Sequence, residues 1–306
     1  MKIILMGQQA FGKSTLEKFH KETDHEIVAV YCAPDKEGKP LDPVKEYAVS
    51  ENLPVFQPSN FKDKEVLEQI KSHNADLCVM AYVIIFVPEE ARDIPKHGSI
   101  CFHPSLLPLH RGPSSINWPI IMGAKKTGLT IFYPNDGLDE GEILLQKEVE
   151  IGEDETLGDV YFNKIFPLGV DACVEAANLL DAGNAPKIAQ DDTKSTYESW
   201  CRKADARIDW KKPGIEVYNL IRGCNPQPGA WAEFMDEEFV FLDTKFSSEQ
   251  SAEHFPGQIM EINAEDVKIA VKGGFLIVSR FKSKEQGKLY VKDMNTAVLT
   301  EGDLFS

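Results

Sequence analysis

The chain has 306 residues, of which 42% are hydrophobic and 27% are charged, and its formal net charge at pH 7 is -16. A chain of this length can bury a large core and is expected to form one large and one smaller domain. The negative charge disfavours a broad grip on nucleic-acid phosphate, although a local basic patch stays open. No apolar run approaches the roughly 18 residues that a membrane-spanning helix needs.

The cysteines favour a reducing compartment. Six of them are scattered along the chain without a CxxC pair, which argues against both a disulfide framework and a zinc site. Met1 and Lys2 lead straight into a core-type strand, so no signal peptide is expected. We therefore expect a cytoplasmic protein that binds no metal.

The first 150 residues alternate short apolar runs with helical patterns. The apolar runs are 3–6, 26–31, 53–56 and 77–82, and helices are expected after 7, from 42–43, and over 63–73. This alternation indicates an α/β fold with a doubly wound parallel sheet.

The chain changes character after residue 150. Helical spacing over 156–182 is broken by Gly183 to Pro186, and a polar segment, 191–209, reads as a linker. One more helix is expected around 210–221. Short β-type runs then follow at 230–234, 239–242, 267–271, 275–281 and 288–291. Their spacing is typical of a small antiparallel barrel or sheet.

The segment from Gly7 to Ser14 spells GxxxxGK[ST], the pattern of a phosphate-binding P-loop. In that interpretation Lys13 holds phosphate and Ser14 holds magnesium. The alternative is a first strand-to-helix turn whose glycines allow close packing. A P-loop enzyme also needs an acid behind an apolar strand. The strand at 77–82 has no acid directly behind it, so we favour the structural turn.

Two predicted strand ends carry the best candidates for chemistry. One run ends at His103 and enters a proline-rich loop, and a second run, 128–133, ends in an acidic turn that contains Asp139. Open α/β sheets place their chemistry at such ends. A histidine can polarise a carbonyl or pass a proton, and an acid can orient it or accept a proton. A buried structural role for His103 stays open, and Asp136 and Glu140 are weaker acid candidates.

The motifs of this region resemble a known family. HPSLLP at 103–108, HRG at 110–112 and GLDEG at 137–141 are similar to the signature of the 10-formyltetrahydrofolate-dependent formyltransferases. The resemblance extends to Gly7 with 11–12, and to 208–210, 221–223 and 226–231. It implies a Rossmann-like formyltransferase domain over 1–200 and a small OB-like β-barrel domain over 205–306. Within the family, the chain looks most like the hydrolase domain of 10-formyltetrahydrofolate dehydrogenase, and it is also similar to methionyl-tRNA formyltransferase.

The resemblance assigns roles residue by residue. It implies that His103 donates a proton or hydrogen bond to the formyl oxygen, and that Asp139 holds His103 charged or relays the proton of the nucleophile. It places the pterin of the formyl donor against two segments, although 84–87 also fits a plain core strand. The implied folate contacts are Tyr82, Ile85, Phe86, Val87, Pro88, Asn135, Asp136 and Gly137.

Three further residues fall in the substrate or oxyanion region, namely Cys101, Ser105 and Arg111. Transformylases of the family carry Asn two residues before the catalytic His, where this chain has Cys101, and a thiol is a weak donor. The hydrolase-domain branch also lacks that Asn. A packing role for Cys101 is favoured over a nucleophile, since no cue lowers its pKa. Arg111 is expected to meet an anionic group or to form a structural ion pair.

The formyl acceptor is left open between water and a small amine. The loop at 33–42 is short and charge-balanced, which with the acidic chain argues against tRNA. Two alternatives remain: a methionyl-tRNA formyltransferase with a local basic patch, and a non-catalytic folate-binding protein. The sequence shows no aldehyde dehydrogenase segment, so if the chain is a free-standing relative of that hydrolase domain, any later oxidation is expected to occur elsewhere or not at all.

Overall fold

The computed structural model describes residues 1–249, 254–284, 287–293 and 299–306. The chain divides into two compact units, each assembled from separate stretches of sequence. The first unit comprises 1–112, 128–149 and 164–197. The second comprises 113–127, 150–163 and 198–306.

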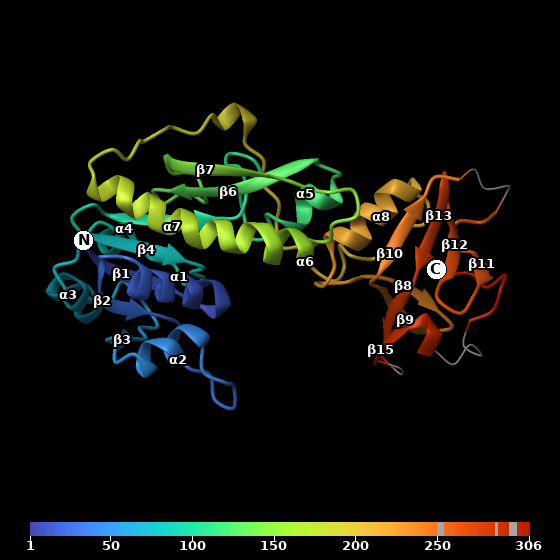
Figure 1. Cartoon of the computed structure of the whole chain (residues 1–306), viewed down its shortest axis with the longest axis horizontal. Coiled ribbons are helices and arrows are strands. Elements are labelled where there is room, and N and C mark those ends of the chain that lie inside the picture. The colour runs from blue at the N-terminus through green and yellow to red at the C-terminus, as the bar shows by residue number, and fades with distance from the viewer. Residues whose placement is uncertain (250–253, 285–286, 294–298) are drawn as a thin grey trace. The chain divides into compact units, whose positions relative to one another are not determined.

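The first unit is built on a seven-stranded sheet (Figure 1). Its strands are β1 (Lys2–Gly7), β2 (Glu26–Tyr31), β3 (Val55–Phe56), β4 (Leu77–Ala81), β5 (Ser99–His103), β6 (Lys126–Phe132) and β7 (Ile143–Glu150). They lie in the order β3-β2-β1-β4-β5-β6-β7. The first five run parallel, and β6 is antiparallel to β5. The predicted α/β class with a mainly parallel sheet is confirmed.

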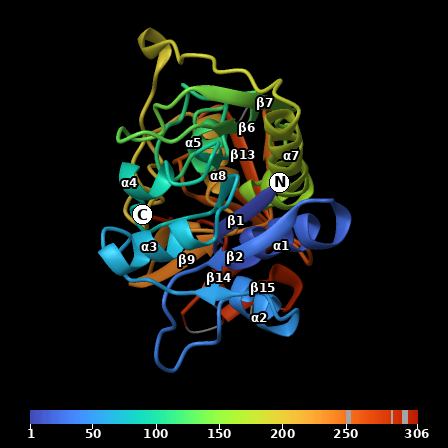
Figure 2. The ribbon, with the colours of Figure 1, turned by 90° about the vertical axis from the view of Figure 1, so that its left-hand side faces the viewer.

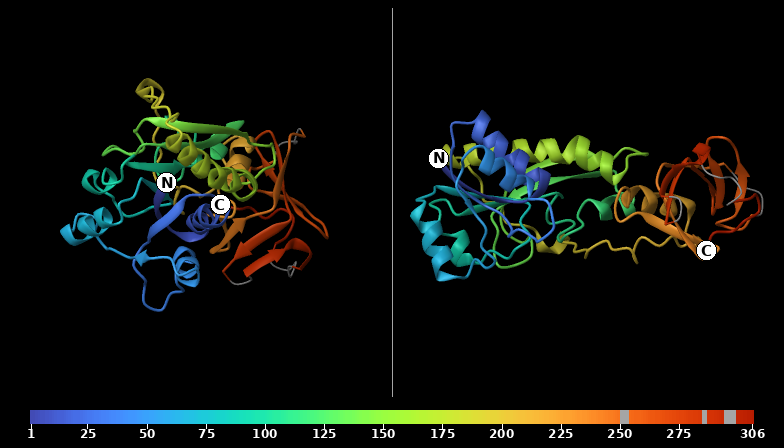
Figure 3. Two further views of the ribbon diagram at one scale, coloured as in Figure 1. Left: turned by 60° about the vertical axis from the view of Figure 1, so that its left-hand side comes forward. Right: turned by 90° about the horizontal axis from the view of Figure 1, so that it is seen from below.

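Helices cover both faces of this sheet, because its central strands are apolar on both sides. One core packs strand residues such as Leu5 and Val79 against α1 (Gln9–Glu22), α2 (Pro43–Ser50) and α7 (Phe166–Asp181). The other packs Ile4 and Met80 against α3 (Lys64–Ser72) and α4 (Glu89–Arg92). Figure 2 shows α1 and α7 on one side of β1 and α3 on the other, and the right-hand view of Figure 3 agrees.

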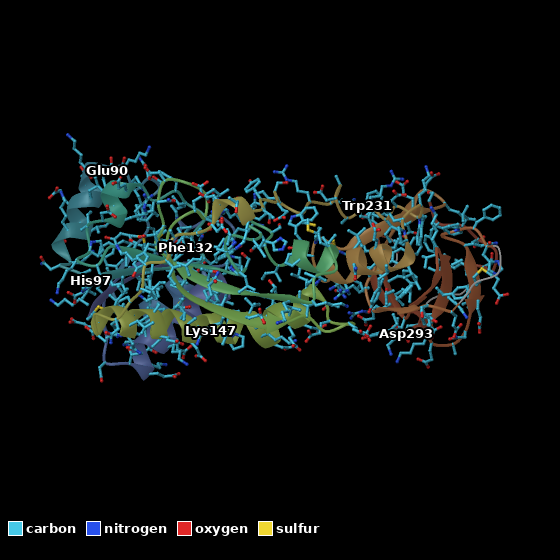
Figure 4. All side chains as sticks on the ribbon, turned by 90° about the horizontal axis from the view of Figure 1, so that it is seen from above. Glu90, His97, Phe132, Lys147, Trp231 and Asp293 are labelled. Carbon is cyan, nitrogen blue, oxygen red and sulfur yellow. The ribbon has the colours of Figure 1, made fainter. Side chains whose placement is uncertain are left out.

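Lys147 ties the last strand of the sheet to its longest helix. This residue, labelled on β7 in Figure 4, forms an ion pair with Glu175 of α7 at 2.5 Å. The helix itself is preceded by a short π-helix, η1 (Tyr161–Ile165), and by α6 (Leu157–Val160), whose N-cap Thr156 forms a capping box with Asp159. The single helix predicted over 156–182 is therefore three consecutive segments.

The GxxxxGK[ST] segment forms a strand-to-helix turn and no phosphate-binding loop. Helix α1 begins at Gln9, so Gly12, Lys13 and Ser14 lie inside the helix. The backbone N–H of Gln9 donates to the Asp42 carboxylate at 3.0 and 3.1 Å, so a side chain already occupies this helix N-terminus. A Cβ on Gly7 would come 2.7 Å from the carbonyl oxygen of Ala81. The structural interpretation of this motif holds.

The second unit carries two four-stranded sheets together with α5 (Asn117–Ile121), α8 (Gly214–Gly223) and the short α6. One sheet has the order β10-β13-β12-β11, and the other β15-β14-β9-β8. The strands are β8 (Ala230–Phe234), β9 (Glu237–Phe241), β10 (Thr244–Ser247), β11 (Ile259–Ile262), β12 (Val267–Val271), β13 (Gly274–Val278), β14 (Arg280–Ser283) and β15 (Gly287–Tyr290). Their antiparallel pairing is that of a small barrel-like domain, as predicted, and the finer OB-like comparison stays a prediction.

One strand prediction in this unit is wrong. The run 275–281 is two strands, because Val278 of β13 pairs with Val267 while Phe281 of β14 pairs with Phe241 in the other sheet. The chain changes sheets at Ser279. A continuous apolar run cannot reveal such a change, since both strands bury their side chains in one core.

Two short 3-10 segments, η2 (Asp192–Lys194) and η3 (Val291–Asp293), also lie within the described residues. Among the described residues, no helix combines the length and apolar character that crossing a membrane requires.

Candidate functional site

His103 ends β5 in the first unit and is almost buried, with 6% of its surface exposed. Its Nε2 lies 2.9 Å from the backbone carbonyl oxygen of His110, and its Nδ1 lies 3.6 Å from Oδ2 of Asp139. A carbonyl oxygen only accepts, so Nε2 carries a proton and the ring is fixed in orientation. The sequence-predicted pair is therefore brought together in space, with Nδ1 as the nitrogen that faces the acid.

The loop after His103 is fixed by its own Ser105 and by residues of β6 and β7. The hydroxyl of Ser105 donates to the Leu109 carbonyl at 2.6 Å, and the hydroxyl of Thr130 donates to the Ser105 carbonyl at 2.7 Å. The side-chain amide of Gln146 donates to the Leu107 carbonyl at 2.7 Å. Ser105 is fully buried. It therefore lacks the accessible hydroxyl that the expected substrate contact needs, and its role in the structure is to shape the loop.

Asp139 lies in a tight turn with a left-handed backbone, at φ 55°. Its Oδ2 accepts a hydrogen bond from the backbone N–H of Gly112 at 2.9 Å. His110, which supplies the carbonyl to His103, also has a positive φ, of 56°. Backbone strain of this kind persists only where surrounding contacts hold it, and it is concentrated at functional sites.

Arg111 is buried and is held by side chains from a distant part of the chain. Its NH2 donates to Asp192 at 2.7 Å, and its NH2 and Nε donate to Oε1 of Gln190 at 2.8 and 3.2 Å. NH1 lies 3.8 Å from Glu140. These contacts fit the structural ion pair, one of the two roles expected for Arg111.

Gln190 and its neighbours were missed by sequence reasoning. They belong to the segment 188–197, which follows α7 and overlaps the linker expected over 191–209 only from residue 191 on. In the structure Thr196 bonds to the backbone of His110, Arg111 and Pro108, so this segment lies along the loop that carries them. A polar stretch without periodicity gives no signal of such packing.

The predicted folate segment 82–88 is a loop, not the core strand of the alternative interpretation. Its side chains alternate. Tyr82, Ile84 and Phe86 are 48%, 63% and 59% exposed, whereas Val83 and Ile85 turn inward to the core that α3 and α4 cover. Val87 and Pro88 are buried, so of the residues predicted to contact folate in this segment, Tyr82 and Phe86 have the most accessible side chains.

Arg92 connects the two segments that the resemblance assigns to folate. Its NH1 donates to the Val87 carbonyl at 2.8 Å and its NH2 to the Asp136 carboxylate at 2.7 Å, and the residue is 4% exposed. In the same turn, the Asn135 side chain accepts from the Gly137 N–H at 3.1 Å. Arg92 was also missed, because an arginine in a short helix carries no sequence signal of its role.

Cys101 is half-buried in β5, and its thiol contacts the Phe102 carbonyl at 3.7 Å. Burial, with the nearby Asp139 charge as a smaller cause, raises the pKa of the Cys101 thiol far above its usual range. The thiol is therefore protonated at neutral pH, which fits a packing role rather than a nucleophile. Among the described residues, no cluster of three or more His, Cys, Asp or Glu side chains forms a metal-binding arrangement.

Two family models cover most of the chain. The formyl transferase model matches residues 1–176, and the formyl transferase C-terminal domain model matches residues 201–297. A cytosolic 10-formyltetrahydrofolate dehydrogenase of Xenopus tropicalis is 38% identical over 99% of this chain. The chain spans about a third of that protein's length, since 35% of it is covered.

Two other proteins match over nearly their full length. A methionyl-tRNA formyltransferase of Clostridioides difficile (strain 630) is 35% identical, with 95% of each chain covered. The solved N-formyltransferase of Helicobacter canadensis, in complex with folinic acid and dTDP-3-aminofucose, has a TM-score of 0.67 at 19% identity and covers 91% of this chain and 98% of its own. That structural likeness concerns the fold.

Proposed function

This chain belongs to the formyl transferase family, and we propose that it transfers the formyl group of 10-formyltetrahydrofolate to water or to a small amine through His103 and Asp139. The observation that carries the proposal is the placement of His103: Nε2 is held by the His110 carbonyl while Nδ1 faces Asp139 at 3.6 Å. This leaves one nitrogen and one carboxylate for proton transfer at a strand end.

The folate-binding part of the proposal rests on the loop 82–88. Tyr82, Ile84 and Phe86 present exposed apolar side chains from one loop, which is unusual for a water-facing segment and suits a flat aromatic ring. Arg92 fixes this loop and Asp136 at once. These residues fit the pterin of the formyl donor, which supplies the one-carbon group when bound.

The catalytic work of the chain follows from the two side chains. His103, protonated on both nitrogens, donates from Nδ1 to the oxygen on which negative charge develops when the nucleophile adds to the formyl carbon. Asp139 accepts the proton that the water or amine loses. Cys101 contributes little to oxyanion binding, because a thiol is a weak donor. Asp139 then passes that proton to N10 as the bond between the formyl carbon and N10 breaks, so that with water as nucleophile the products are formate and tetrahydrofolate.

The test is single-turnover loss of 10-formyltetrahydrofolate without an acceptor, in the wild type and in His103→Ala and Asp139→Ala. We expect formate release by the wild type and a loss of at least about 100-fold in both variants, the range typical of a general acid or base. Tight folate binding without turnover favours an amine acceptor or a non-catalytic folate-binding protein, and adding amines separates these two. Absence of folate binding contradicts the proposal.

A tRNA acceptor is the second candidate, favoured by the match to a methionyl-tRNA formyltransferase over 95% of both chains. Against it, the cations around Trp231 in the second unit are paired, Arg207 with Glu233 at 3.0 Å and Lys203 with Glu238. We expect no strong tRNA binding at physiological salt. Fluorescence anisotropy with labelled initiator tRNA across a salt series tests this, and a steep fall of affinity with salt would support the tRNA enzyme.

A further inference from the structure

Gln190 hydrogen-bonds both to the turn of Asp139 and to Arg111, in the loop of His110. Its Nε2 donates to the carbonyl oxygens of Asp139 and Gly141, each at 2.8 Å. Its Oε1 accepts both Nε and NH2 of Arg111. Both donor protons and the acceptor oxygen of the amide are thus used, and the amide orientation is fixed by its partners.

These bonds add a second connection between the two partners of His103, beside the bond from the Gly112 N–H to Asp139. Arg111 lies between His110, whose carbonyl accepts from Nε2 of His103, and Gly112, whose N–H donates to the Asp139 carboxylate. Gln190 joins Arg111 to the backbone of the same aspartate. The two partners of the His103 ring are therefore joined through Gln190 in addition to the bond from Gly112 to Asp139 and the ion pair of Arg111 with Glu140, and Gln190 acts on His103 only through these partners.

The turn of Asp139 needs such support. Asp139 has a left-handed backbone, which is unfavourable for a residue with a Cβ. Its carboxylate is aimed at His103 only while that conformation persists. The two hydrogen bonds that Gln190 donates to the Asp139 and Gly141 carbonyls stabilise this turn conformation.

We propose that Gln190 is a positioning residue for the proton-transfer pair, setting the approach of the Asp139 carboxylate to Nδ1 of His103. This inference rests on the function proposed above. It assigns a task to residue 190 that no motif of the sequence indicates. Misplacing a catalytic group by about 1 Å can cost about 100-fold in rate, so the effect is expected on kcat.

Gln190→Glu distinguishes the donor function of the Gln190 amide from its acceptor function. The carboxylate keeps an acceptor for Arg111 but has no donor for the carbonyls of Asp139 and Gly141, and its oxygen would face theirs. Gln190→Ala removes both contacts. If donation to the turn is what matters, the isosteric Glu variant is as impaired as the Ala variant. The matched control is Gln69→Glu in α3, which makes the same change of side chain and charge away from the pair.

Kinetics give the first readout. We expect kcat for formyl loss to fall by about 10- to 100-fold in both Gln190 variants. The KM for 10-formyltetrahydrofolate should stay within about threefold, since Tyr82 and Phe86 lie on another loop, and a KM change alone is not the signature of a lost transition-state contact. Gln69→Glu should match the wild type. Normal kcat in Gln190→Glu would overturn the inference, even if Gln190→Ala is slow, because contact with Arg111 would then suffice.

A second readout does not depend on turnover. Nitrogen-15 spectra of histidine-labelled protein report the protonation of each ring nitrogen, and the wild type should show Nε2 of His103 protonated. We expect both Gln190 variants to shift the His103 nitrogen signals while near-ultraviolet circular dichroism stays native. Unchanged His103 signals in both variants would overturn the inference. Because this readout needs no turnover, it decides the role of Gln190 even if the wild type fails to release formate.

Discussion

His103 has a different kind of partner on each ring nitrogen. A neutral carbonyl holds Nε2 at 2.9 Å, whereas a carboxylate faces Nδ1 at 3.6 Å. The first contact fixes which nitrogen keeps its proton, and the second marks the nitrogen that is available for chemistry. A histidine with a purely structural role in a core needs neither two different partners on its ring nitrogens nor a carboxylate facing one of them.

The cysteines show how strongly burial separates residues of one type. Burial raises the pKa of the thiol of Cys32 to about 11, and those of Cys78 and Cys173 to about 12. Cys201 is the exception, because a hydrogen bond from Cys224, whose sulfur lies 3.9 Å away, lowers its thiol pKa. Reactivity follows the thiolate, so Cys201 is the thiol that should react first.

We therefore predict one fast-reacting thiol in the native protein. At pH 8 a thiol of pKa about 11 is only about one part in a thousand thiolate, and its rate should rise about tenfold per pH unit below that pKa. A disulfide reagent should modify one thiol rapidly, and all six only after unfolding. Cys201→Ser should remove the fast phase, with Cys173→Ser as the matched control. A fast phase that persists in Cys201→Ser would contradict the prediction.

At the scale of elements, the first strand and helix meet by backbone contact. Gly7 and Gly12 lie against each other and against the carbonyl of Ala81, while Asp42 bonds to the N–H groups of Gln9 and Val44 and so caps both α1 and α2. Aspartate is a favoured N-cap residue. The pattern that spells a P-loop is thus explained by packing and capping.

This explanation predicts that two substitutions within the motif differ in their effect on stability. Gly7→Ala should lower the free energy of unfolding by about 1–3 kcal/mol, since the new Cβ would meet the Ala81 carbonyl at 2.7 Å and backbone cannot move aside cheaply. Lys13→Ala should leave both stability and formyl loss unchanged within about 0.5 kcal/mol, because the side chain is only half-buried and, in a structural turn, has no phosphate to hold. Urea denaturation measures both, and a loss of activity in Lys13→Ala would revive the nucleotide-binding interpretation.

At the scale of the whole molecule, the two compact units are not consecutive in sequence. The second unit takes α5 from the first half of the chain and packs it on α8, where Asn117 donates to the Gly223 carbonyl at 3.0 Å and a Cβ on Gly223 would meet Ile121 at 2.6 Å. A domain boundary at 200–205, as the sequence suggests, stays a prediction, and the packing of α5 on α8 bears on it.

A fragment of residues 1–200 should therefore be less stable than the same stretch in the full chain. It would keep α5 but lose α8, leaving apolar side chains such as Ile120 and Ile121 exposed to water. We expect a lower melting temperature and binding of a hydrophobic dye, compared with the full chain. Asn117→Ala in the full chain is the milder counterpart and should lower stability by about 1 kcal/mol or more. A fragment that melts cooperatively at the temperature of the full chain would contradict this.

Local patterns in the sequence were sufficient for most elements and for the pair His103 and Asp139. Alternation and apolar runs predicted the bounds of β2, β8 and β12 to the residue, because the burial of a strand depends on its own order of apolar and polar side chains. The motifs HPSLLP and GLDEG indicated which His and Asp to consider. The pairing of strands into sheets was harder to predict, as the division of 275–281 between two sheets shows.

Only the tertiary structure decided which distant side chains support the loops of the site. Gln190 bonds to the turn of Asp139 and Arg92 bonds to Asp136, in each case about 50 positions away along the chain, and such contacts leave no periodic trace in sequence. The outward alternation of Tyr82, Ile84 and Phe86 in a loop has the same origin, since neighbouring helices, not propensity, decide which side chains face the core. Periodicity encodes burial along one element, whereas positioning depends on which separate elements fold against each other.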